Sequence, residues 1–393
     1  MNLQQRRSAL RRWLDRALGV IDPETLVAQA LHPGGPDPVT VIAIGKAAPG
    51  MCRGAAQALG SITGVSVTNA AAEVPEGIEL LIGDHPLPGG RSLAAGRRVL
   101  EVAKAATGRC VVLISGGGSA LCEHPVPGVD LDLLRRAGEA LLDGGASIED
   151  INLVRSHLSA IKGGGLARVV PGELETYVIS DVGPAGPEVV ASGPTIPRPH
   201  NPQRALELLD AYGVEVNPDQ RAAIARRPEE TPRRGPVTVL ADGMTAARAV
   251  VAAAKEEGVE ARVADEWLDG PVEECLRRLL EDARSGVTVA AGEPDVKVRQ
   301  PGVGGRNSHA ALLAAIELAG AEDIFAAFAT DGVDGRSDGA GAIVDGTTVA
   351  RGGDAEAALA RCDSALYLDE TGDLLRTGPT GTNVSDLWVL WRP

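Results

Sequence analysis

Glycine-rich turns and charged side chains follow several apolar segments, a pattern typical of sites that bind phosphate. Lys46 comes directly after the apolar run 38–45, and residues 115–119 (SGGGS) follow the run 109–115. Glycine lets backbone N–H groups approach an anion closely, and a helix that begins after the turn adds the positive end of its dipole. An ordinary tight turn between a strand and a helix is the competing interpretation of the same residues.

Two further glycine-rich segments carry a basic side chain. The segment 162–165 (KGGG) is a second candidate for binding phosphate, and the segment 302–307 (GVGGRN) carries Arg306. The guanidinium group of arginine presents a planar set of donors that suits a phosphate or a carboxylate. Glu293 lies shortly before this segment, which favours a functional loop over a solvent-exposed turn.

Acidic residues after two other apolar runs suit a general base or a Mg²⁺ ligand. Asp181 follows the run 175–180, and Asp331 and Asp334 lie among glycines in the loop 330–339. Carboxylates in such loops can accept a proton or bind a divalent cation. They also commonly cap helices, which is the structural alternative.

Several other chemistries do not fit the sequence. A P-loop is excluded because Thr40 stands where its first glycine belongs and Ala47 stands where Ser or Thr belongs. Ser119 lacks the nucleophile elbow of hydrolases, since position 121 is leucine. The histidines form no H-E-x-x-H pattern, and no G-x-G-x-x-G follows the first apolar run. Zinc and dinucleotide chemistry are therefore disfavoured.

Apolar runs alternate with amphipathic stretches along the chain, which predicts βαβ units and a buried, mostly parallel sheet. The runs are 38–45, 109–115, 175–180, 235–242, 286–292 and 324–330, and helices are expected at 92–106 and 245–258. The charged segment 225–236 contains three prolines and precedes a new strand. We therefore predict an α/β fold of two doubly wound, Rossmann-like three-layer domains, 1–230 and 231–393, facing across a cleft.

Composition restricts the class of partner. The chain has 393 residues and a net charge of −15, which excludes an electrostatic grip on nucleic acid or on an anionic membrane surface. No apolar stretch reaches the roughly 18 residues that a transmembrane helix needs. Arg11, Arg12 and Asp15 interrupt the N-terminus, so we expect an amphipathic surface helix there instead of a signal peptide. Five widely spaced cysteines argue against disulfides, and a cytoplasmic location is expected.

Seven segments, taken in order, resemble the class II glycerate 2-kinase family, whose members join an N-terminal domain to a C-terminal MOFRL domain. The resemblance runs from about residue 8 to residue 390. The segments are AIGKAAPGM (43–51), SGGGSAL (115–121), INLVRSHLSAIKGGGLA (151–167), YVISDV with ASGPT (177–182 and 191–195), GVGGRN (302–307), ATDGVDGRSDGAGAIVDG (329–346) and GPTGTNVSDL (378–387).

The resemblance implies a kinase that uses ATP and Mg²⁺ to convert D-glycerate, a small-molecule substrate, to 2-phosphoglycerate. Lys46 and Arg306 match basic residues of the family's active site, and Asp181 is expected to act as the base or to hold Mg²⁺. The other candidates are Ser115, Gly116, Gly117, Gly118, Ser119, Lys162, Gly163 and Gly164 for the nucleotide phosphates, Arg155, Glu293 and Asn307 for the substrate, and Asp331 and Asp334 for the metal. A homodimer is an assembly that the analogy allows.

Three other functions remain open at this point. A hydroxypyruvate reductase would oxidise NAD(P)H, and the missing dinucleotide fingerprint argues against it. A kinase for a different small hydroxy acid would share the site but not the substrate. A non-catalytic protein that binds a nucleotide or a metabolite is favoured only by residues 183–186 (GPAG), where relatives often carry acids.

Overall fold

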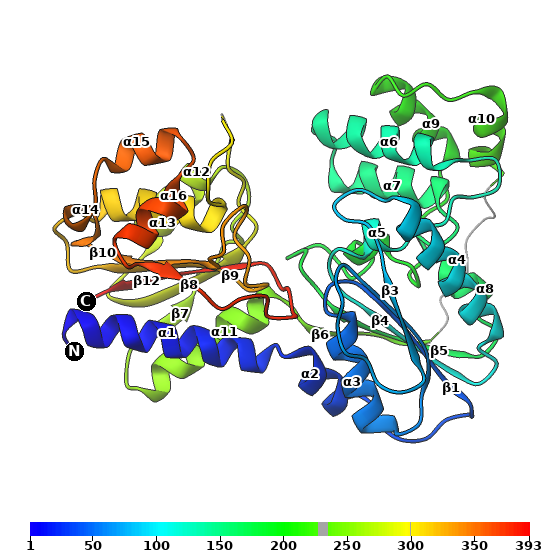
Figure 1. Cartoon of the computed structure of the whole chain (residues 1–393), viewed down its shortest axis with the longest axis horizontal. Coiled ribbons are helices and arrows are strands. Elements are labelled where there is room, and N and C mark those ends of the chain that lie inside the picture. Colours follow the sequence, from blue (N-terminus) through cyan, green and yellow to red (C-terminus); the bar gives the residue numbers. More distant parts are fainter. Residues whose placement is uncertain (227–234, 299) are drawn as a thin grey trace. The chain divides into compact units, whose positions relative to one another are not determined.

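The computed structural model describes residues 1–226, 235–298 and 300–393. The chain forms two compact units (Figure 1). We call them the N-terminal unit, residues 23–240, and the C-terminal unit, residues 1–22 together with 241–393.

This division differs from the expected one at residue 230 in two ways. The first helix belongs to the C-terminal unit, and the strand expected to open the second domain, 237–241, is instead the last strand of the first sheet. The backbone N–H of Thr176 donates to the carbonyl of Pro236 at 3.0 Å, next to that strand. The charged segment 225–236 lies mostly outside the described residues, since the description stops at 226 and resumes at 235.

The N-terminal unit contains a six-stranded sheet in the order β3-β2-β1-β4-β5-β6. Strands β3, β2, β1, β4 and β5 pair in parallel. The bounds are β1 (Val39–Ile44), β2 (Thr63–Thr68), β3 (Ile78–Ile82), β4 (Arg109–Ile114), β5 (Glu173–Ile179) and β6 (Val237–Ala241). Strands β2 and β3 are added on one side of β1, and β4, β5 and β6 on the other, so the strand order reverses between β1 and β4. Ligands of open α/β sheets bind beyond the carboxyl ends of the strands at such a point.

The apolar composition of β1 and β4 places them in the centre of the sheet. Every residue of β4, and every residue of β1 after Val39, is buried. On one face, Ile42 and Val112 pack in the same core cluster as Val99 of α4 (Gly90–Ala105). Burial of continuous apolar strands between helices is what favours parallel pairing, so the α/β prediction is confirmed for this unit.

A second core of this unit is helical and packs beside the sheet. It joins Leu133 of α6, Val154 of α7, Leu208 of α9 and Ile224 of α10. Figure 1 shows these four helices together. The helices of the unit are α2 (Pro23–Ala30), α3 (Ala48–Leu59), α4, α5 (Gly118–Leu121), α6 (Leu131–Asp143), α7 (Ile148–Leu158), α8 (Gly165–Val169), the 3₁₀ turn η1 (Val190–Ser192), α9 (Pro202–Ala211) and α10 (Pro218–Ala225).

The sheet of the C-terminal unit is mixed, in the order β11-β10-β9-β12-β8-β7, and so corrects the expectation of a mostly parallel sheet. Among the strands of this sheet in the described residues, only β7 and β8 pair in parallel. The last strand, β12, lies antiparallel between β8 and β9, and its first residue, Asp386, is opposite Gly292 and Ala329. The strands are β7 (Ala261–Val263), β8 (Gly286–Gly292), β9 (Ile324–Ala329), β10 (Gly341–Asp345), β11 (Leu374–Leu375) and β12 (Asp386–Arg392).

The helix α1 (Leu3–Val20) is anchored to the C-terminal unit through an apolar and a charged contact. The ring centroids of Trp13 and Trp391 lie 5.0 Å apart. Arg7 pairs with Asp345 at 2.5 Å and with Asp373 at 2.6 Å, and both carboxylates are buried. The amphipathic helix expected at the N-terminus is therefore present. The other helices of this unit are α11 (Gly243–Glu256), α12 (Val272–Asp282), α13 (Arg306–Glu317), α14 (Thr348–Arg351), α15 (Ala355–Ala360) and α16 (Ser364–Glu370).

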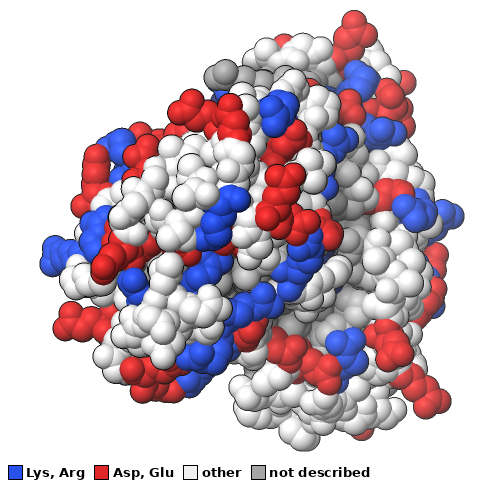
Figure 2. All heavy atoms as spheres, turned by 60° about the vertical axis from the view of Figure 1, so that its left-hand side comes forward, with Lys and Arg blue, Asp and Glu red and all other residues white. Residues whose placement is uncertain are grey.

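Acidic and basic side chains are interspersed on the face that Figure 2 shows. Exposed ion pairs of the chain include Arg98 with Glu79 at 2.8 Å and Arg277 with Glu281 at 2.6 Å. Exposed pairs of this kind add little to stability, so the fold depends on the buried contacts above. All five cysteines are free thiols. Among the described residues, no helix is long and apolar enough to cross a membrane.

Candidate active site

Two loops bond to each other where β1 and β4 end. The backbone N–H of Lys46, after β1, donates to the carbonyl of Gly116 at 2.9 Å. The N–H of Ala47 donates to the hydroxyl of Ser115 at 3.0 Å. We call residues 115–119 the glycine loop. The structure therefore brings two separately predicted segments to one point of the parallel sheet, where the strand order reverses.

The glycine loop passes between two charged side chains, which explains why its residues are glycines. A Cβ on Gly116 would lie 1.9 Å from Oδ2 of Asp181, the second residue after the end of β5. Gly117 has a φ of +82°, and a Cβ there would lie 3.3 Å from Cγ of Lys46. Larger residues would displace either the carboxylate or the lysine stem. Lys46, Asp181 and the loop thus form one site.

Backbone donors, more than a helix dipole, make this loop suitable for an anion. The helix that follows, α5, has only four residues, so the expected contribution of a helix N-terminus is small. In the part of the chain that the structure describes, no acceptor is found for the N–H groups of Gly116, Gly117 and Gly118. Closely spaced backbone donors in a turn with a left-handed residue form a concavity that suits a phosphate oxygen.

The segment 162–165 does not form the second phosphate site that the sequence predicted. The side chain of Lys162 is 3% exposed and pairs with the buried carboxylate of Glu123. Burial lowers the pKa of Lys162, and the carboxylate of Glu123 opposes that effect. The N–H of Gly163 donates to the carbonyl of Ser192 at 2.9 Å, and the N–H of Gly164 to that of Gly193 at 2.8 Å. The charge of Lys162 and the N–H donors of the segment 162–165 are thus directed into the protein interior.

Arg155 lies in the last turn of α7 in the same unit and is half-buried. Burial lowers the pKa of Arg155, and the negative charge of Glu123 opposes this shift. Within the described residues its guanidinium group has no hydrogen-bond or ion-pair partner. Contact between Arg155 and the substrate therefore stays a prediction.

A second charged centre lies in the C-terminal unit, around Arg306 at the start of α13. Its Nε donates to Oδ2 of Asp386 at 2.5 Å, and its Nη1 donates to Oε1 of Glu293 at 2.9 Å. Three elements meet here because β12 is antiparallel to its neighbours, so its first residue lies beside the carboxyl end of β8. Glu293 follows that end directly.

The electrostatics of this centre keep Arg306 charged. Burial by itself would lower the pKa of Arg306, but the carboxylates of Asp386 and Glu293 outweigh burial and raise it above its usual value. Burial raises the pKa of Asp386 to about 7, against the opposing effects of Arg306 and Asn307. An arginine with one exposed and one buried counterion can bind an anion without losing its orientation.

Asp386 was missed by the sequence reasoning, although it lies in the quoted segment 378–387. The sequence did offer a signal for Asp386, because it is an acid that directly precedes a run of bulky apolar residues (LWVLW). A carboxylate buried at such a position needs a partner. The pairing with Arg306 spans 80 positions and depends on where β12 enters the sheet. No local sequence pattern predicts where β12 enters the sheet.

Two residues of this unit that were predicted to bind a ligand are instead buried and bonded within the protein. Asn307 is 1% exposed and accepts a hydrogen bond from Nε1 of Trp388 at 3.2 Å. Asp334 is 2% exposed, and its carboxylate accepts from the N–H groups of Gly305, Asn307 and Ser308 at 3.1, 2.9 and 2.8 Å. Asp334 therefore caps the N-terminus of α13. We correct the roles of Asn307 as a substrate ligand and of Asp334 as a metal ligand accordingly.

Asp331 stays a candidate for binding a cation. Its Oδ1 accepts from the N–H of Val333 at 3.1 Å, and it is half-buried. The described part of the chain contains no group of three or more His, Cys, Asp or Glu side chains placed to hold a metal ion. A single carboxylate is compatible with Mg²⁺ all the same, because Mg²⁺ usually takes one or two carboxylates and completes its shell with water and substrate phosphates.

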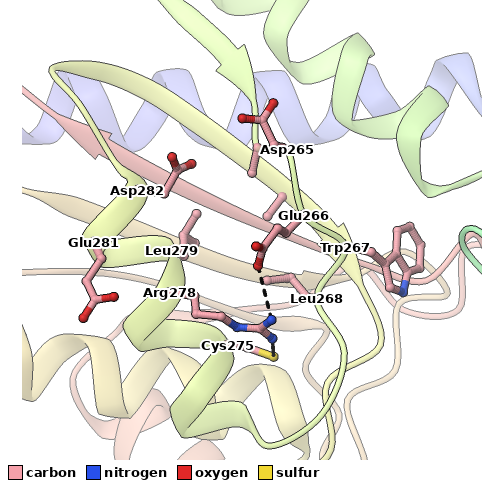
Figure 3. Close-up of a pocket in the computed structure, with 11 residues that line it drawn as sticks. Asp265, Glu266, Trp267, Leu268, Cys275, Arg278, Leu279, Glu281 and Asp282 are labelled. Carbon is pink, nitrogen blue, oxygen red and sulfur yellow. Dashed lines mark hydrogen bonds and ion pairs between the residues drawn. The ribbon is translucent and has the colours of Figure 1, made fainter.

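A separate cavity of about 380 Å³ lies beside α12 in the C-terminal unit (Figure 3). Arg278 lies between Glu266, at 3.2 Å, and the sulfur of Cys275, at 3.4 Å. Asp265, Glu266, Glu281 and Asp282 line the cavity as well, and Trp267 lies to one side in Figure 3. Four carboxylates disfavour a phosphate, so this cavity is not a nucleotide site.

Comparisons with known proteins also find two parts in the chain. Residues 9–225 match a family described as "Domain of unknown function (DUF4147)", and residues 286–386 match the MOFRL family. A D-glycerate 2-kinase from Thermotoga maritima is 36% identical over 400 residues, which cover 95% of each chain. A glycerate 2-kinase from Pyrococcus horikoshii is 35% identical and covers 89% of this chain and 86% of that one. A crystal structure of glycerate kinase from Thermotoga maritima matches with a TM-score of 0.89 and 33% identity, covering 99% of this chain and 100% of that chain.

Proposed function

The chain belongs to the glycerate 2-kinase family, and from that premise we propose that it transfers the terminal phosphoryl group of ATP to D-glycerate and forms 2-phosphoglycerate. It is an enzyme, a kinase that uses a nucleotide and acts on a small molecule. The proposal is based on one observation: Lys46, the glycine loop and Asp181 lie close together at the carboxyl ends of the strands of the parallel sheet. Phosphoryl transfer needs just such donors and charges, because its catalysis is mainly positioning and charge neutralisation.

The nucleotide phosphates are assigned to the glycine loop. The N–H groups of Gly116, Gly117 and Gly118 are the donors for phosphate oxygens. This assignment is supported by the lack of an acceptor for these N–H groups among the described residues. The stem of Lys46 lies against Gly117, so its ammonium group can neutralise the charge that develops on the transferred phosphoryl group. A preorganised cation that acts in this way favours the transition state over the ground state.

Asp181 is the candidate for either of two roles beside the loop. Its carboxylate could accept the proton of the glycerate hydroxyl, or it could hold Mg²⁺ together with oxygens of the nucleotide. When bound, Mg²⁺ would neutralise charge on the phosphate oxygens. Asp331 is the candidate carboxylate for a cation in the C-terminal unit. The two roles of Asp181 differ in their dependence on Mg²⁺ concentration, which separates them by experiment.

Arg306 is assigned to an anionic group of the substrates, either the carboxylate of glycerate or a phosphate. Asp386 holds the guanidinium group from the interior, and Glu293 is exposed enough to exchange with a ligand. Arginine suits this task because two parallel N–H donors match two oxygens of one anion. Arg155, a half-buried cation, is the second candidate for such a contact.

One observation keeps a reductase as the second candidate. The strand order β3-β2-β1-β4-β5-β6 is the order of dinucleotide-binding folds. The residues after β1, 45–50, read GKAAPG and lack the spacing of the dinucleotide fingerprint, so the kinase is favoured. Free thiols at all five cysteines support a cytoplasmic location for the enzyme.

The test is ADP release by the purified chain with ATP, Mg²⁺ and D-glycerate. We expect release that depends on D-glycerate, with ATP alone and L-glycerate as controls, and an NMR spectrum of the product that identifies 2-phosphoglycerate. Loss of NADH with hydroxypyruvate, in the absence of ADP release, would replace the kinase with the reductase. Binding of ATP without turnover on any small hydroxy acid would replace it with a nucleotide-binding protein.

A further inference from the structure

A turn of unusual backbone conformation lies next to the glycine loop. Ala191, Ser192 and Gly193 follow one another with φ values of 50°, 61° and 61°. Residues other than glycine rarely adopt this left-handed conformation, and two of them in succession are rarer still. Strain of this kind persists only where surrounding contacts hold it, and it is concentrated at functional sites. We call residues 191–193 the left-handed turn.

The left-handed turn contacts the glycine loop directly. The hydroxyl oxygens of Ser192 and Ser119 lie 2.8 Å apart. A Cβ on Gly118 would lie 2.7 Å from the Cβ of Ala191, so the methyl group of Ala191 fills the space beside that glycine. These contacts depend on the turn conformation, because an extended backbone at 191 and 192 would point both side chains elsewhere.

The segment 162–165 holds the turn from its other side. Its N–H groups donate to the carbonyls of Ser192 and Gly193, at 2.9 and 2.8 Å. Lys162 pairs with Glu123, which comes four positions after Ser119 along the chain. The left-handed turn therefore contacts both the glycine loop and the segment 162–165, although the three are far apart in the sequence.

The hydrogen bond between the two serines has a direction. Ser192 is 0% exposed, and within the described part of the chain its hydroxyl has Ser119 as its partner. A buried hydroxyl proton needs an acceptor, so Ser192 donates and Ser119 accepts. The single proton of Ser119, which is half-buried, is then left to donate to a ligand. This orientation is the one that a phosphate oxygen would require.

We propose that Ser192, held in its left-handed conformation by the segment 162–165, is a positioning residue that directs the hydroxyl proton of Ser119 toward a nucleotide phosphate. The proposal rests on the assignment of the glycine loop to the nucleotide. It also gives the glycines at 163 and 164 a role, since their N–H groups hold the carbonyls of the turn. Ser192 acts through Ser119 and touches no reacting atom.

The test is a double-substitution cycle of Ser192→Ala and Ser119→Ala, read as KM for ATP, KM for glycerate and kcat. We expect each single change to raise KM for ATP about tenfold or more, as the loss of one hydrogen bond to a charged group does, and to leave KM for glycerate unchanged. The double variant should be no worse than Ser119→Ala alone, because both changes remove the same interaction.

Two further variants separate positioning from general packing. Thr176→Val removes a buried hydroxyl–hydroxyl bond of the same unit, to Thr195 at 3.0 Å, and should leave KM for ATP unchanged. Ala191→Gly should leave Tm unchanged or higher, because glycine adopts the turn without strain, while KM for ATP rises. A merely structural turn would change stability and affinity in the same direction.

The outcomes distinguish this proposal from the one on which it rests. Ser192→Ala with an unchanged KM for ATP, combined with an effect of Ser119→Ala, would overturn the positioning role and leave the glycine loop as the phosphate site. An unchanged KM for ATP in both variants and in Gly117→Ala would overturn the assignment of the loop itself. Equal losses in Ser192→Ala and Thr176→Val would show a packing effect only.

Discussion

Replacing Asp386 with asparagine tests how the C-terminal unit orients Arg306. The substitution keeps the shape of the side chain and removes its charge. In the structure the carboxylate is 2% exposed and accepts from Nε of Arg306 at 2.5 Å, whereas Glu293, the other partner, is 53% exposed. In the variant, Arg306 keeps only the exposed counterion, so its orientation is no longer held from the interior.

The expected magnitude follows from the burial of the pair. Removing one partner of a buried, hydrogen-bonded charge pair in a binding site costs about 2–5 kcal/mol of binding free energy. The side chain of Arg306 is 33% exposed and keeps Glu293, so solvent and the second carboxylate offset part of that cost. We expect a loss of about 2 kcal/mol in transition-state stabilisation, which is about 30-fold in kcat/KM. The free energy of unfolding should change by about 1 kcal/mol or less, because an ionised Asp386 is itself costly to bury.

The pH dependence provides an independent measurement. Burial raises the pKa of Asp386 to about 7, so the wild-type kcat/KM should rise as the pH increases through 7 and the carboxylate ionises. The raised pKa also means that this group's contribution to stability is complete below its unfolded pKa, about 4, and is lost as the pH rises through 7. Both effects should be absent in Asp386→Asn.

The assay is steady-state ADP release between pH 5.5 and 8.5 for both proteins, with unfolding by urea as the stability control. An Asp386→Asn variant with more than a third of the wild-type kcat/KM would refute the reasoning that Asp386 orients Arg306. A variant that keeps the acid limb of the wild-type profile would refute the assignment of that limb to Asp386. A large loss of stability with equal loss of activity would indicate a structural role.

Three other substitutions test separate parts of the structure. Lys46→Ala should lower kcat/KM about 100-fold or more, as expected for loss of a transition-state donor, with the exposed Lys104→Ala as the matched control in ADP release. Asp331→Asn should weaken the dependence of turnover on Mg²⁺, measured by titration with MgCl₂, and an unchanged titration would leave Asp331 as a turn residue only. Arg7→Ala should lower the free energy of unfolding by about 2–3 kcal/mol, because two buried carboxylates lose a partner while Arg351 stays on Asp373 at 2.6 Å. Arg12→Ala, which removes a largely exposed ion pair on the same helix, should change unfolding in urea by about 1 kcal/mol or less.

The sequence determined the elements whose signal is local. Strands β1, β4, β5, β8 and β9 lie within two residues of the expected runs, because continuous apolar stretches between helices have few other stable conformations. The loops that follow β1, β5, β8 and β9 carry charged residues, as predicted, and the glycine loop follows β4. In a parallel sheet the carboxyl ends of the strands share one edge, so position in the sequence already implied that Lys46 and the glycine loop could meet.

Only the tertiary structure decided which polar groups remain available to a ligand. The glycine-rich segments 115–119 and 162–165 look alike in the sequence, yet Glu123 and the carbonyls of residues 192 and 193 take the charge and the donors of the second. Asp331 and Asp334 look alike as well, but Asp334 caps α13. A buried charge or donor is satisfied by whichever group the fold brings next to it, and that neighbour is usually distant in sequence.

The same reasoning applies to the architecture of the second sheet. The sequence shows that 386–392 can form a strand, but its entry between β8 and β9, antiparallel to both, depends on contacts with residues about 60 to 100 positions away. That entry places Asp386 beside Arg306 and thereby creates the second charged centre. Local pattern thus determined the strands and their polar ends, whereas long-range pairing decided their neighbours, because pairing energy depends on the whole packed sheet and not on any one segment.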